Sequence, residues 1–187
     1  MRKSFWLLIC CLLLAVLLAS GCAPSTRKIM TNEYPRYVSS GLQSTNLENI
    51  SSPSNKCQVQ TVALISSWVT AGSPEKDPFD FTSVDGKACQ GNFENDVQPL
   101  FTTPNLWYAG ALSCRTCHGP DVKISYMGLN LSSYQGIKAG ANGQDILGGG
   151  NWQTSKLSAI LSSGVMPPAK PANYDVNGPI VFAGMPK

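Results

Sequence analysis

The sequence predicts a mainly α-helical protein, in which a small helical domain follows a loop-rich extension that contains one short strand. Three observations support this class. After residue 92, short apolar runs are preceded by capping residues and closed by glycine or proline, which is typical of helices. Residues 23–56 are rich in Ser, Thr, Asn and Pro and have no sustained apolar period. Between these regions, residues 57–69 alternate briefly and then turn apolar, which indicates a strand or hairpin arm.

The first 21 residues have the pattern of an export signal. Arg2 and Lys3 precede an uncharged, largely apolar run over residues 5–23. Its end, Leu-Ala-Ser-Gly-Cys, resembles the lipobox of bacterial lipoproteins, and the resemblance implies cleavage before Cys22 and acylation of that cysteine. A retained transmembrane helix is the alternative, because a run of this length just spans a bilayer. Under either interpretation the segment tethers the chain to a membrane, facing the periplasm or the cell exterior.

Length and composition bound the rest of the chain. In 187 residues there is room for one domain with an extension, or for two small domains. We expect the signal peptide or anchor over residues 1–21, the tether and extension over 22–91 and the main domain over 92–187. Only 13% of the residues are charged and the net charge is +3, which argues against a nucleic-acid partner. With 17 Gly and 13 Pro, the chain should be rich in loops.

The chemistry of the main domain centres on one pentapeptide, Cys114-Arg115-Thr116-Cys117-His118. Two thiols three residues apart, followed at once by a histidine, are the attachment signature of c-type haem. On one helical turn both sulfurs can reach the two vinyl groups of a haem, and the histidine can bind the iron. A thioredoxin-like pair would follow a strand, and a zinc site would need a second ligand pair; neither context is evident. We therefore predict one covalently bound haem c.

The remaining cysteines follow a simple pattern. Cys10 and Cys11 lie in the signal and Cys22 is assigned to lipid, which leaves Cys57 and Cys89. In an oxidising compartment we expect these two to form a disulfide. Closing a loop of this size stabilises the fold by roughly 3–4 kcal/mol. Two buried free thiols are the alternative.

Capping and breaking residues set the limits of the helices expected after residue 92. The first helix should begin at Asn95 or Asp96 and end before Pro104, and the second should span residues 108–117 and end at Gly119-Pro120. The third should be capped by a serine before Tyr134 and end at Gly140. The fourth should be capped by Thr154 or Ser155 and end at Gly164.

If the iron is six-coordinate, its second axial ligand must come from another residue type. His118 is the only histidine in the sequence, so two histidines from this chain cannot bind the iron, and a methionine is expected. Met127 follows His118 too closely to cross to the opposite face of the haem. Met166 opens a Met-Pro-Pro run after the last predicted helix and has the room. The predicted iron ligands are therefore His118 and Met166, with Met185 as a second candidate for the sixth position.

The Cys114–His118 motif, the later helix with its closing glycine and Met166-Pro167-Pro168 resemble the class I cytochromes c across roughly residues 92–170. The resemblance implies a small bundle of helices around one haem, His and Met axial ligands and one exposed haem edge. Members of that family usually finish with a helix packed on the first one, whereas residues 169–187 are rich in Pro and Gly. The extension or a partner would then have to cover the exposed apolar face.

A His–Met site exchanges one electron with little rearrangement, so we predict a membrane-anchored electron carrier of a respiratory or photosynthetic chain, with no catalytic residues. The lipid anchor, the long extension and the single haem resemble the monohaem cytochrome subunit of alternative complex III, a bacterial quinol-oxidising assembly. This resemblance implies two kinds of partner. One is the lipid bilayer, and the other is a redox protein or the subunits of a membrane complex. Two alternatives remain: a haem with an open sixth position, acting as a peroxidase or gas sensor, and a mainly structural subunit.

Overall fold

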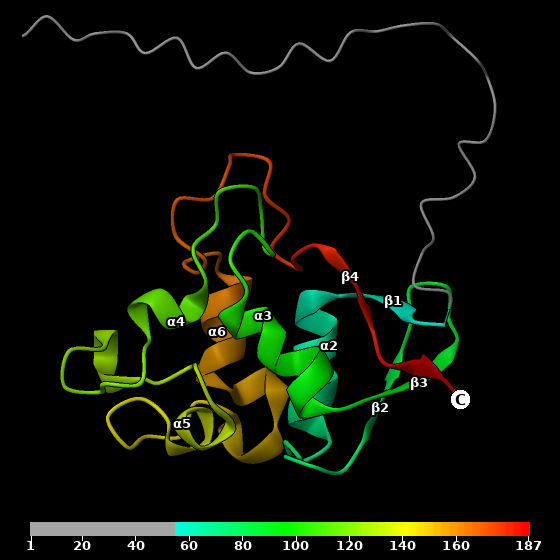
Figure 1. Ribbon diagram of the computed structural model, residues 1–187, viewed down its shortest axis with the longest axis horizontal. Coiled ribbons are helices and arrows are strands. Elements are labelled where there is room, and N and C mark those ends of the chain that lie inside the picture. The colour runs from blue at the N-terminus through cyan, green and yellow to red at the C-terminus, as the bar shows by residue number, and fades with distance from the viewer. Residues whose placement is uncertain (1–54) are drawn as a thin grey trace, which may run out of the picture. The chain divides into compact units, whose positions relative to one another are not determined.

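The computed structural model describes residues 55–187 (Figure 1). The predicted signal over residues 1–21, the lipidation site Cys22 and the first part of the extension lie outside the described residues. None of the helices in the described part has both the length and the apolar character that a membrane span requires. The elements are β1 Cys57–Gln60, α2 Thr61–Thr70, β2 Phe79–Thr82, β3 Ala88–Gly91, η1 Phe93–Val97, α3 Gln98–Thr102, α4 Cys114–Cys117, η2 Tyr126–Gly128, α5 Tyr134–Ala139, η3 Gly148–Gly150, η4 Trp152–Thr154, α6 Lys156–Ser162, β4 Ile180–Ala183 and β5 Met185–Pro186.

Two small antiparallel sheets correct the predicted fold class. Strand β1 pairs with β4, and β2, β3 and β5 form the second sheet in that order. Helix makes up only 35% and strand 15%, so the expected mainly α fold of the class I cytochrome c type is wrong. The reason is the sequence distance between partners: β1 and β4 lie near opposite ends of the described chain, where a local apolar period cannot reveal their pairing.

The strand predicted over residues 57–69 is confirmed only for β1. From Thr61 onward the chain forms α2, whose buried residues follow a helical spacing. Gln60 provides no side-chain cap; instead, the N–H groups of Thr61 and Val62 donate to the carbonyls of Pro179 and Asn177 at 3.0 and 3.1 Å. Because these acceptors belong to the C-terminal segment, tertiary contact decides where α2 begins.

Helix α2 supplies the centre of the hydrophobic core. The indole of Trp68 is fully buried, with its ring centroid 5.1 Å from that of Phe93 and 6.4 Å from that of Tyr134. Residues 57–91 thus share one core with the helices after residue 92, and the expectation of a loop-rich extension is wrong for this segment. The contact of Trp68 with Phe93 also covers an apolar side of η1. From the sequence we expected either the extension or a partner to cover the apolar face of the main domain, and Trp68 belongs to the extension as predicted over residues 22–91.

The caps predicted for the later helices are mostly confirmed. Ser133 caps α5 by accepting from the N–H of Gly136, and Ser155 caps α6 by accepting from the N–H of Ser158. The first helix is capped by Asn92, not by Asn95 or Asp96 as predicted. Local sequence therefore suffices for these helix starts, to within a few residues.

Cys57 and Cys89 form the predicted disulfide, with Cα atoms 6.5 Å apart and a sequence separation of 32 positions. Both cysteines are buried. The bond joins β1 to β3 and therefore links the two sheets covalently. A bond that closes a loop of this length contributes about 3–4 kcal/mol to the free energy of unfolding.

The carboxylate of Asp96 links segments of the same region through hydrogen bonds and an ion pair. It is buried, and it accepts the N–H of Asn92 at 2.9 Å and the N–H of Gly184 at 2.8 Å. The Nζ of Lys56 lies 3.4 Å from the same carboxylate. A buried charge needs such partners, and here they come from both ends of the described chain.

Candidate haem site

The predicted haem-attachment motif lies on the single turn of α4, and His118 is its C-terminal capping residue. The helix predicted over residues 108–117 is confirmed only for this last turn. The preceding segment is a loop, closed by a hydrogen bond of 2.8 Å from the N–H of Asn105 to the carbonyl of Ala111. That loop carries the chain to α4 without regular structure, so the motif does not follow a strand as a thioredoxin-like pair would.

Both thiols of the motif are free. Burial raises the pKa of Cys114 to about 11, whereas Cys117 is exposed. Residues three apart on a helix share one side of it, so both sulfurs can face the same planar group. Among residues 55–187, no group of three or more His, Cys, Asp or Glu side chains is gathered to hold a metal ion, as the zinc alternative would require.

The imidazole of His118 is buried and held in one orientation. Its Nδ1 lies 3.0 Å from the carbonyl oxygen of Tyr126. Because a carbonyl only accepts, Nδ1 carries the proton and Nε2 keeps a free lone pair. Burial lowers the pKa of His118, while the carbonyl acts in the opposite direction, so the ring is neutral at pH 7. A neutral imidazole whose second nitrogen donates to a carbonyl is the usual form of a metal-ligating histidine.

Met166 lies half-buried in the loop that follows α6. Two hydrogen bonds hold this loop: the hydroxyl of Tyr108 donates to the carbonyl of Pro168, and the Nζ of Lys170 donates to the carbonyl of Gly164. Tyr108 comes from the loop that leads into α4. The contact therefore joins the Met166 loop to the segment that carries the thiols, and Figure 1 shows the two loops side by side.

The other two candidate methionines occupy different places. Met185 lies in β5, where it pairs with Gln90 of β3, and Figure 1 shows the C-terminus across the domain from α4. Met127 directly follows Tyr126 and is more than half exposed. Of the three, Met166 alone sits in a loop that is bonded to the approach to α4.

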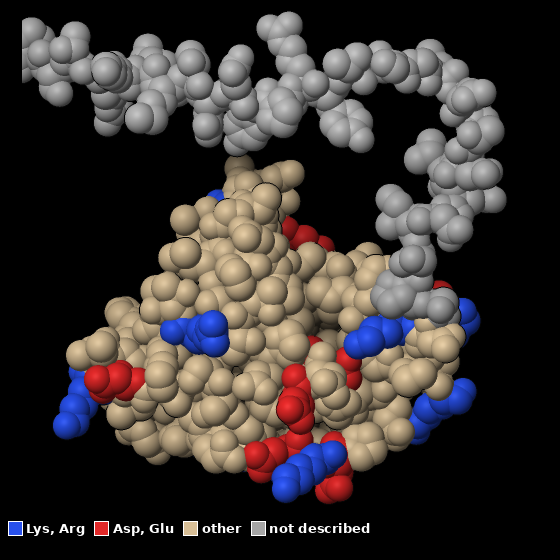
Figure 2. All heavy atoms as spheres, viewed as in Figure 1, with Lys and Arg blue, Asp and Glu red and all other residues tan. Residues whose placement is uncertain are grey.

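Large apolar side chains are exposed in the segments that flank α4 and Met166. Each is more than half exposed: Leu112, Val122, Ile124, Tyr126, Met127 and Val165. Figure 2 shows one face of the molecule, on which charged side chains are sparse. Exposed apolar side chains that gather beside a motif often mark a surface that binds a ligand or partner. A large apolar group bound beside α4 would cover such residues, so the side chains present fit a haem in both chemistry and hydropathy.

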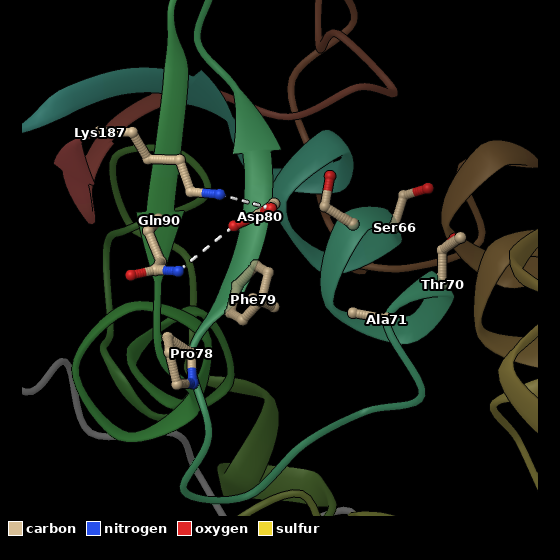
Figure 3. Close-up of a pocket in the computed structure, with 9 residues that line it drawn as sticks. Ser66, Thr70, Ala71, Pro78, Phe79, Asp80, Gln90 and Lys187 are labelled. Carbon is tan, nitrogen blue, oxygen red and sulfur yellow. Dashed lines mark hydrogen bonds and ion pairs between the residues drawn. The ribbon is translucent and has the colours of Figure 1, made fainter.

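A polar cavity of about 610 Å³ lies elsewhere, between α2 and the strands β2 and β3 (Figure 3). Asp80 lies at its wall, 2.6 Å from the Nζ of Lys187 and 3.4 Å from the Nε2 of Gln90. The cavity is lined by Ser66, Ser67, Thr70, Ala71, Pro78, Phe79, Asp80, Gln90 and Lys187. This lining contains no Cys, His or Met, so the cavity is not part of the haem site.

Two free thiols on one helical turn, an oriented neutral imidazole and a bonded methionine loop are the features of a c-type cytochrome-like domain. A comparison with known families agrees, because residues 114–170 match the family described as Planctomycete cytochrome C. The match begins at the first thiol of the motif and ends just beyond the Met166 loop. No curated protein matches the chain.

Sequence reasoning missed the residues that orient the site. Tyr126 acts through its backbone carbonyl, which carries no signal in residue type. Tyr108 acts through a hydroxyl that reaches a residue 60 positions away. Neither contact follows from local spacing, although a tyrosine shortly before the motif could have been flagged as a polar group in need of a partner.

Proposed function

We propose that the protein is a membrane-anchored monohaem c-type cytochrome that transfers single electrons in a respiratory or photosynthetic chain. In this proposal Cys114 and Cys117 hold one haem c through thioether bonds, and His118 and Met166 bind its iron. The bound haem supplies an iron centre that takes up and gives back one electron. The observation that carries the proposal is the oriented, neutral His118 directly after the turn that bears two free thiols.

The other residues of the site hold ligands in place. The Tyr126 carbonyl fixes the His118 ring, so that Nε2 stays free for the iron. Tyr108 and Lys170 restrain the loop around Met166. A site held in this way changes little between oxidation states, which favours electron transfer. The only histidine of the sequence is used by the iron, so general acid–base catalysis by a second histidine is excluded.

Covalent attachment and axial ligation can be tested in one host that matures c-type cytochromes. We expect the purified protein to keep its haem on a denaturing gel and to show the corresponding mass increase. Met166→Ala should abolish the low-spin ferric spectrum, while the matched variant Met185→Ala should retain it. Wild-type protein without bound haem would refute the proposal. A high-spin wild-type spectrum that Met166→Ala leaves unchanged would instead support a peroxidase or gas sensor with an open sixth position.

The anchor and the complex are further parts of the proposal. The lipobox-like end of the signal supports acylation of Cys22, so Cys22→Ser should release the protein from the membrane fraction, unless the segment is retained as a transmembrane helix. The predicted lipid anchor, the long extension and the single haem motif support membership of a quinol-oxidising complex. Native purification from membranes, followed by identification of co-migrating subunits, should show redox proteins; a partner set without redox centres would favour the mainly structural role.

A further inference from the structure

One buried polar group beside the site has no hydrogen-bond partner in the part of the chain that the structure describes. The hydroxyl oxygen of Tyr174 is shielded from solvent, and among the described residues no hydrogen-bond partner lies near it. Native proteins leave few buried hydroxyl groups unpaired, since the loss of hydration is not compensated. The group is therefore a candidate for binding something other than the protein itself.

Tyr174 belongs to the same pair of loops that holds Met166. Its ring packs edge-on against Tyr108 at a centroid distance of 6.0 Å, and Tyr108 in turn donates to Pro168. Burial raises the pKa of Tyr174 to about 12, and the neighbouring carboxylate of Asp175 adds to this effect. The phenol thus stays protonated at neutral pH and is available as a donor.

The chemistry of the missing acceptor follows from what a haem brings to such a place. A haem carries two carboxylates, and a carboxylate that is drawn into an apolar surrounding needs donors. The sulfur of Met166 is only a weak acceptor and would compensate a buried hydroxyl poorly. We propose that the Tyr174 hydroxyl donates a hydrogen bond to a carboxylate of the haem. This inference rests on the proposed function, because it requires the haem to be bound at Cys114 and Cys117.

Tyr174 would then be a positioning residue that also affects the iron through charge. A carboxylate near the iron favours the oxidised state, and a hydrogen bond to that carboxylate weakens its effect. Tyr174→Phe removes only the hydroxyl, so it should lower the reduction potential of the haem-loaded protein at fixed pH. It should also shift the haem carboxylate bending band in the resonance Raman spectrum, while the low-spin spectrum stays the same.

Tyr134→Phe is the matched control, because the Tyr134 hydroxyl donates to the carbonyl of Ser73 at 2.9 Å, outside the haem site. This variant should change neither the potential nor the Raman band. If Tyr174→Phe also changes neither, in protein that carries covalent haem, the inference fails and the proposed function stands. If the Raman band stays and the methionine–iron absorption moves, the hydroxyl bonds to Met166 instead, and the inference is again refuted.

A measurement on the wild-type protein covers the case in which Tyr174→Phe does not load haem. In protein with isotope-labelled tyrosine rings, the infrared difference spectrum between the reduced and oxidised forms should contain a band from a hydrogen-bonding phenol. The absence of any tyrosine band in that spectrum would overturn the inference. The absence of haem from the wild type would overturn the proposed function itself.

Discussion

The disulfide-linked sheets and the region around α4 differ in whether their reactive side chains have partners within the described residues. In the sheets, Cys57 and Cys89 are bonded to each other and Asp96 has its partners within the chain. Around α4, both thiols are free, apolar side chains are exposed and the Tyr174 hydroxyl is unpaired among the described residues. The first region is complete as a protein fold. The second has the features of a binding surface for a large apolar group with polar ends.

The sharpest way to test this contrast is to remove each cysteine pair in turn. Cys114→Ala with Cys117→Ala should abolish covalent haem completely, because no thioether can form. Cys57→Ala with Cys89→Ala should keep the haem and lower the free energy of unfolding by about 3–4 kcal/mol. Haem staining and denaturant unfolding measure the two outcomes. If the variant without Cys57 and Cys89 folds fully but carries no haem, the two regions are not distinct in the way proposed.

The buried carboxylate of Asp96 should matter to stability and not to the haem. Asp96→Ala leaves the N–H groups of Asn92 and Gly184 and the ammonium of Lys56 without their acceptor, and we expect a loss of about 4 kcal/mol in unfolding free energy. Asp80→Ala, which removes an exposed partner of Lys187, is the control and should change stability little. Equal effects in the two variants would contradict this role of the buried carboxylate.

The C-terminal segment can be tested at Gly178, where it packs on the start of α2. Its φ is +75°, and an added Cβ would lie 1.9 Å from the Thr61 Oγ1 and 2.9 Å from the Trp107 ring. Gly178→Ala should therefore destabilise the fold by about 3 kcal/mol, as measured by denaturant unfolding. Gly72→Ala has a similar φ of +86° but open space around it, so only the backbone cost of about 1 kcal/mol is expected. Similar losses of unfolding free energy for both variants would show that Gly178 is not packed tightly against Thr61 and Trp107.

The smallest effect is expected at the cap of α6, the helix that leads to Met166. Ser155→Ala removes the acceptor for the N–H of Ser158 and should lower the free energy of unfolding by about 1 kcal/mol. Ser163→Ala, at the exposed end of the same helix, should cost less than about 0.5 kcal/mol. Thermal unfolding of the haem-loaded variants would resolve this difference, and a larger loss at Ser163 would place the main restraint of α6 at its other end.

Local spacing predicted the parts of the molecule whose chemistry is local. The motif Cys114–His118 lies on one turn with free thiols, the cap at Ser155 forms as expected, and the pairing of Cys57 with Cys89 is confirmed. The pairing followed from counting, since the other cysteines had been assigned to other uses. The roles of the two thiols and of Met166 in haem binding stay predictions.

Long-range contacts decided the rest. An apolar run after Cys57 predicts a strand, but α2 begins at Thr61 because carbonyls near the C-terminus accept its first N–H groups. The two sheets depend on strands far apart in sequence, and they overturned the mainly α fold class.

The sequence by itself determined the residue types and the spacing of the Cys114–His118 motif, from which haem attachment is predicted, because that pattern lies within one short stretch of chain. Only the tertiary structure decided that a Tyr126 carbonyl orients His118, that Tyr108 bonds the Met166 loop and that the Tyr174 hydroxyl finds no hydrogen-bond partner within residues 55–187. These contacts join segments that chain spacing alone does not bring together, so they arise only when the whole core packs.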